Sequence, residues 1–113
     1  MTAPTIDTAT FTELQDTAGA DFVVELVDTF LEEAPQLLAE LEAARVAGDA
    51  VAFQRAAHSL KSNANTFGAF AFGEMARAFE RGGLAQAPDD AALQPLNQAY
   101  AEVAAALKGL QHG

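Results

Sequence analysis

Apolar residues recur at helical spacing along most of the chain, and this pattern limits the fold to a packing of helices. In residues 22–41 the apolar positions fall on one face of a helix; they are Phe22, Leu26, Phe30, Leu37, Leu38 and Leu41. Ala is abundant, alternating β-branched runs are missing, and no Asn-Gly or Asp-Gly hairpin turn occurs. The sequence therefore predicts an all-α protein.

Local signals place the first helices. The stretch "TFTE" reads as a capping box with Thr10 as N-cap and Glu13 reaching back, and the short helix that follows should end near Gly19. Asp21 can cap a second helix. Pro35 interrupts that helix, which predicts either a kink or two abutting helices.

The second half of the chain predicts three further helices. Gly48 followed by Asp49 reads as a C-cap and a new N-cap. The expected ranges are 50–66, closed by Gly68, then 70–81, and a last helix that begins with Pro88 or, because of Pro95, later. Short connections favour antiparallel neighbours, so residues 1–113 should form a single domain, an antiparallel up-down four-helix bundle with an additional short N-terminal helix.

Composition excludes several classes of function. The net charge of −10 argues against nucleic-acid binding, and no Cys is available for a disulfide, a thiolate metal site or a nucleophile. No Gly-rich phosphate loop or acidic metal cluster occurs, so neither cofactor nor metal is expected. No apolar run is long enough to span a membrane, and the N-terminus lacks a signal peptide, so we expect a cytoplasmic protein without membrane contact.

Basic residues gather in one segment of this acidic chain. Between positions 50 and 85 there are four basic and two acidic residues, a net +2, which leaves −12 for the remainder. The basic residues are Arg55, Lys61, Arg77 and Arg81. Chance in a small sample can give this distribution; alternatively, the segment forms a positive patch for an anionic group or an acidic partner.

His58 lies at the centre of that segment. On a helical wheel, the apolar side chains cluster opposite it; they are Phe53, Ala56, Ala57, Leu60, Ala64 and Phe67. The side chains within roughly 60° of His58 are Gln54, Arg55, Lys61, Ser62 and Asn65. His58 therefore points to solvent, either as an ordinary exposed histidine or as a reactive one.

The neighbours of His58 restrict its chemistry. A metal site wants a second ligand at i+3 or i+4, where Lys61 and Ser62 stand instead. A serine hydrolase needs a pocket and an oxyanion hole, which a solvated helix face does not offer. A histidine nucleophile that accepts a phosphoryl group remains, and Lys61 supplies a cation on the same face.

The stretch "HSLKSNANTFGAF" closely resembles the signature of histidine-containing phosphotransfer (HPt) domains, and the resemblance extends over nearly the whole chain. It implies a four-helix bundle in which His58 is phosphorylated, Lys61 offsets the phosphoryl charge and Gly68 ends the active-site helix. Ser62 stands where the family often has Gly. Glu80 is either the residue that hydrogen-bonds the imidazole or an ordinary solvated acid.

The resemblance implies a phosphocarrier of a multistep phosphorelay, without autonomous catalytic activity. Its partners would be response-regulator receiver domains, with a hybrid histidine kinase as another donor, and a monomer is expected. The residues expected to contact these partners are Gln54, Arg55, Ser62, Asn65, Gly68 and Arg77. The alternative is a helical adaptor that binds receivers or kinases without carrying phosphate. His112 is interpreted as part of the tail, not as a second phosphorylation site.

Overall fold

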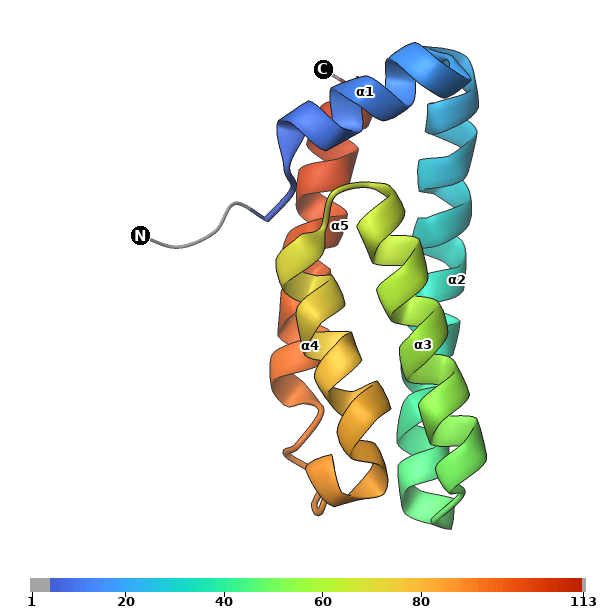
Figure 1. Cartoon of the computed structure of the whole chain (residues 1–113), viewed down its shortest axis with the longest axis vertical. Helices are drawn as coiled ribbons and strands as arrows, with labels where there is room; N and C mark the ends of the chain where they lie inside the picture. Colours follow the sequence, from blue (N-terminus) through green and yellow to red (C-terminus); the bar gives the residue numbers. More distant parts are fainter. Residues whose placement is uncertain (1–4, 113) are drawn as a thin grey trace.

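Four helices run side by side along the long axis of the molecule, and a shorter one crosses their end (Figure 1). The computed structural model describes residues 5–112. The elements are α1 (Thr8–Ala18), α2 (Ala20–Ala47), α3 (Ala50–Thr66), α4 (Phe70–Gly82), the short 3-10 helix η1 (Gly83–Gln86) and α5 (Gln94–His112). Residues 5–112 contain no strand, and the predicted up-down bundle with an additional N-terminal helix is confirmed.

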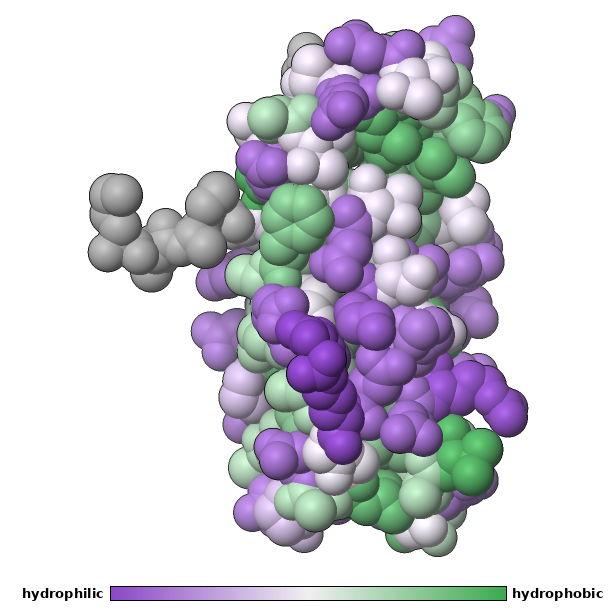
Figure 2. Space-filling view, viewed as in Figure 1, coloured by the Kyte–Doolittle hydropathy of each residue, from purple (hydrophilic) through white to green (hydrophobic). Residues whose placement is uncertain are grey.

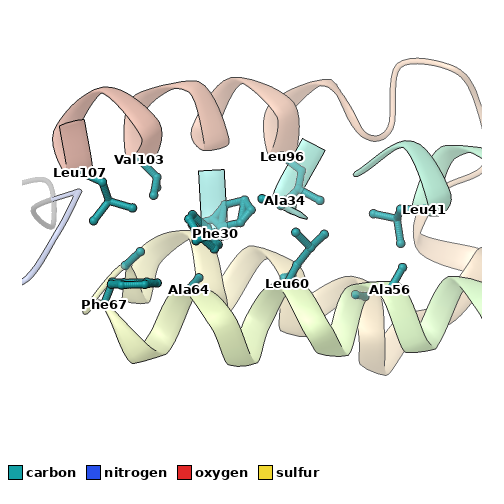
Figure 3. Close-up of a cluster of buried hydrophobic side chains, with 14 of the residues drawn as sticks. Phe30, Ala34, Leu41, Ala56, Leu60, Ala64, Phe67, Leu96, Val103 and Leu107 are labelled. Carbon is teal, nitrogen blue, oxygen red and sulfur yellow. The ribbon is translucent and has the colours of Figure 1, made fainter. Parts of the chain in front are cut away.

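The core lies between the long helices. Aromatic and aliphatic side chains from α2, α3 and α5 interdigitate there, among them Phe30, Leu60 and Leu107 (Figure 3). Phe30 of α2 packs its ring against Phe67 at a centroid distance of 5.5 Å. The helices are thus held by apolar burial, and among the described residues no polar or charged residue is buried.

The N-terminus of α1 differs from the predicted capping box. The helix begins at Thr8, and Phe11 N–H already donates to Asp7 O at 3.1 Å. The hydroxyl of Thr10 donates to the Asp7 carboxylate at 2.5 Å, so Thr10 lies inside the helix and is not its cap. Asp7 N–H in turn donates to Gly68 O at 2.9 Å, which ties the start of α1 to the α3–α4 turn. This tertiary bond explains why the helix starts earlier than the local signal predicts.

Asp21 and Pro35 of α2 also depart from expectation. Asp21 is not the cap but lies in the first turn, because Gly19 makes the change of direction with φ of 97°. The alternative of two abutting helices is wrong, since α2 continues through Pro35. Proline removes the donor for the carbonyl of Leu31, and the Tyr100 hydroxyl of α5 donates to that carbonyl at 3.4 Å. The bundle itself therefore stabilises the continuous helix.

The helix that positions His58 forms as predicted. Gly48 adopts a left-handed φ of 71°, and the Asp49 carboxylate accepts a hydrogen bond from Ala52 N–H at 3.0 Å. The last helix, in contrast, does not begin at Pro88. It begins at Gln94, where Pro95 falls in the first turn and loses no intrahelical bond. No helix of the described residues is long and apolar enough to cross a membrane.

Candidate functional site

His58 lies on the outer face of α3, and its side chain is 59% exposed. The opposite face of α3 is buried, as the helical wheel predicts; it consists of Phe53, Ala56, Ala57, Leu60 and Ala64. In the same view as Figure 1, hydrophilic side chains gather over the middle of α3 and α4 (Figure 2). His58 is thus held on a rigid helix and presented on a polar surface.

Glu80 of α4 brings His58 and Lys61 together. His58 Nδ1 lies 2.6 Å from Glu80 Oε2, and Lys61 Nζ donates to Glu80 Oε1 at 2.7 Å. One carboxylate therefore holds both side chains, each through a different oxygen. The predicted contact between Glu80 and the imidazole is present, and Glu80 is not an ordinary solvated acid, since its side chain is only 20% exposed.

The electrostatics keep Glu80 ionised. The Lys61 ammonium, and after it the hydrogen bond with His58, hold the pKa of Glu80 below its ordinary value against the opposing effect of burial. An ionised carboxylate only accepts hydrogen bonds, so Nδ1 of His58 carries a proton and donates a hydrogen bond to Glu80. In the tautomer with the proton on Nδ1, Nε2 keeps its lone pair and is the nitrogen that can act as a nucleophile.

The packing of α3 against α4 sets this geometry. Phe53 of α3 meets Phe79 of α4 edge to face at 6.1 Å. The side-chain amide of Gln54 donates to the backbone carbonyl of Glu80 at 3.1 Å. The helical wheel places Gln54 beside His58. It does not show which group of the neighbouring helix lies opposite Gln54, so this hydrogen bond could not be predicted from the sequence.

The residues expected to contact a partner differ in their exposure to solvent. Arg55, Ser62 and Asn65 are exposed along α3, and Gln54 is exposed apart from its bond to Glu80. Asn65 lies over Gly73 of α4, where an added Cβ would come within 2.1 Å of Asn65 Oδ1. The glycine therefore leaves room for this side chain between the helices.

Gly68 and Arg77 are less accessible than the expected contact residues on α3. Gly68 is buried with φ of 85°, and an added Cβ would lie 2.9 Å from Asp7 O. Its expected contact with a partner is therefore wrong, because α1 covers it. Arg77 is half-buried on α4 and pairs with Glu74 at 3.3 Å. The side chain of His112 lies outside what the structure describes.

A cavity lies away from His58. It measures about 500 Å³ and is a groove between α2 and α3, lined by residues that include Leu37, Ala44 and Arg55 but not His58. No group of three or more metal-ligating side chains occurs among the described residues. An exposed histidine on a helix face suits a group carried by another protein better than an enclosed small substrate.

Comparisons with known proteins agree with this arrangement. A family model described as Hpt domain matches residues 25–112. Among solved structures, the chain is similar to the crystal structure of histidine-containing phosphotransfer protein B (HptB) from Pseudomonas aeruginosa PAO1. The sequence identity is 26%, the TM-score is 0.85, and the match covers 98% of this chain and 97% of that chain. A comparison with curated protein sequences gives no match.

Proposed function

Because the chain belongs to the Hpt domain family and is a phosphotransfer carrier of a phosphorelay, we propose that His58 is the residue that carries the phosphoryl group. The observation that carries this proposal is the hydrogen bond from His58 Nδ1 to Glu80 on an exposed helix face. It leaves Nε2 as the nucleophilic nitrogen, on a side chain that a partner can reach. Lys61 supports the same assignment because its ammonium binds the other oxygen of the carboxylate that holds the imidazole.

The transfer step follows from this geometry. The Nε2 lone pair attacks the phosphorus of an aspartyl phosphate on a receiver domain; the N–P bond forms, the P–O bond to the aspartate breaks, and the carboxylate leaves. Positive charge develops on the ring, and Glu80 stabilises it through the Nδ1–H hydrogen bond. Lys61 offsets the negative charge of the phosphoryl group. In the reverse direction, a receiver carboxylate attacks the phosphorus and His58 leaves as the neutral imidazole.

The surface around His58 supports docking of a receiver domain. Gln54, Arg55, Ser62 and Asn65 surround His58 on α3, and Arg77 lies on α4. Arg55 adds positive charge to this surface of an otherwise acidic protein, which suits an acidic partner, whereas the charge of Arg77 is paired with Glu74. A hybrid histidine kinase is a second donor class. We also propose that the carrier works as a cytoplasmic monomer and has no catalytic activity of its own.

Transfer of labelled phosphate tests the assignment of His58. The protein, His58→Gln and the matched control His112→Gln are each incubated with a phosphorylated receiver domain. The wild type and His112→Gln are expected to take up label that is lost in mild acid and kept in base, as phosphohistidine requires, whereas His58→Gln takes up none. Label on His58→Gln contradicts the assignment. If the folded wild-type protein binds receiver domains but takes up no label, the result favours the alternative of a helical adaptor that carries no phosphate.

A further inference from the structure

Three successive turns of α3 all bind one residue of α4. His58 and Lys61 hold the two carboxylate oxygens of Glu80, and Gln54 holds its backbone carbonyl at 3.1 Å. Gln54 and His58 lie four residues apart, so they share one face of α3. Gln54 therefore fixes the backbone from which the Glu80 carboxylate reaches the imidazole.

The end of α4 needs such an anchor. The helix ends at Gly82, so Glu80 belongs to its last turn, where backbone carbonyls lack the donors that a continuing helix provides. The next residue, Gly83, has φ of 64°, and nothing lies within 4 Å of the Cβ that it lacks. Two consecutive glycines restrain the backbone weakly, and the side chain of Gln54 supplies a donor from the neighbouring helix.

We propose that Gln54 is a positioning residue for phosphoryl transfer. It holds the last turn of α4 in place, and through Glu80 it keeps His58 in the Nδ1–H tautomer with Nε2 free to react. The inference rests on the proposed function of His58 and deepens it, because Gln54 acts through Glu80 and not on the transferred group. A role as a receiver contact is the competing explanation for any defect at this exposed position.

Two substitutions separate these roles. Gln54→Met keeps the length and the helix propensity of the side chain but removes the donor, without adding charge. Gln54→Lys keeps an N–H donor at the same position. Gln98→Met is the matched control, because Gln98 is an exposed glutamine on α5. Circular dichroism verifies that all three variants retain the helical fold.

Two readouts depend on the imidazole and need no docking surface. The first is the ¹⁵N chemical shifts of the His58 ring, which distinguish the Nδ1–H from the Nε2–H tautomer. The second is the rate of phosphorylation by phosphoramidate, a small donor that does not cover the protein surface. In Gln54→Met the shifts are expected to move toward a mixture of tautomers, and phosphorylation should slow by about threefold to tenfold, the effect of one lost hydrogen bond.

The other variants complete the test. Gln54→Lys and Gln98→Met are expected to keep the wild-type ring shifts. If Gln54→Met keeps both the wild-type shifts and the wild-type rate with phosphoramidate, the positioning role is overturned; a defect with a receiver domain alone then identifies Gln54 as a docking contact. That result leaves the phosphorylation of His58 intact, whereas label on His58→Gln contradicts the proposed function itself.

Discussion

The shared carboxylate of Glu80 makes the stability of the protein depend on pH in a defined direction. In Glu80→Gln the side chain keeps its shape, but only one of its two terminal atoms accepts a hydrogen bond. His58 and Lys61 each donate to a separate oxygen of Glu80 in the wild type. The substitution therefore removes the ion pair with Lys61. It also leaves at least one of the two donors facing the amide NH2 group, which cannot accept a hydrogen bond.

The magnitude follows from the exposure of the partners. The side chains of Lys61 and Glu80 are 25% and 20% exposed, so solvent screens the pair only partly. Partly exposed pairs of this kind contribute about 1 kcal/mol to the free energy of unfolding. With an unfolding entropy of about 2.1 cal/mol/K per residue over 113 residues, this amounts to a decrease in Tm of about 4 °C.

The sign of the pH dependence follows from the pKa of Glu80, which Lys61 first and His58 second hold below its ordinary value. Because the folded state binds the proton less readily than the unfolded state, the stabilisation is complete above the unfolded pKa. It is lost as the pH falls through the folded pKa. The difference in the free energy of unfolding between the wild type and Glu80→Gln should therefore be present at neutral pH and should disappear in acid.

Urea unfolding monitored by circular dichroism, from about pH 7 to about pH 2, measures this difference. Glu102→Gln is the matched control, because Glu102 is an exposed acid on α5. A difference between the wild type and Glu80→Gln that stays constant into acid refutes the reasoning. So does an equal difference for Glu102→Gln, since general charge effects would then explain both.

Three further predictions concern the exposed face around His58 and the two turns at the ends of α3. Lys61→Ala should slow phosphoryl transfer by about tenfold while the helix content stays unchanged; an unchanged rate contradicts its role in offsetting charge. Ser62→Gln, one turn from His58, should block transfer from a receiver domain but not from phosphoramidate, and normal receiver transfer would place the docking face elsewhere. Gly48→Ala should lower the free energy of unfolding by about 1 kcal/mol, because the backbone at this position is left-handed. Gly68→Ala should lower it by about 3 kcal/mol, because the added Cβ would also clash with Asp7 O. Urea unfolding compares the two, and equal losses would contradict the packing of α1 on Gly68.

Sequence predicts best where the determining contacts are local. The start of α3 depends on Gly48 and Asp49, which act within one turn, and the sequence predicts it correctly. The start of α1 and the continuity of α2 depend on groups far along the chain. Asp7 N–H binds Gly68 O, and the hydroxyl of Tyr100 replaces the donor that Pro35 lacks. No local pattern contains those bonds.

The same division applies to the site. The outward direction of His58 follows from the apolar spacing of α3 alone, and the resemblance to HPt domains singled out Glu80. That Glu80 also binds Lys61, and that Gln54 binds the Glu80 backbone, follows from the register between two antiparallel helices. That register depends on packing such as the contact of Phe53 with Phe79, which a helical wheel does not describe.

The most direct test of the account determines which nitrogen of which histidine carries phosphorus. The protein is labelled with ¹⁵N in its histidine rings, phosphorylated by a receiver domain and measured by NMR for scalar coupling between ¹⁵N and ³¹P. One-bond coupling is expected at Nε2 of His58, with Nδ1 still protonated and donating to Glu80. Coupling at Nδ1 of His58, or on His112 in place of His58, would contradict it.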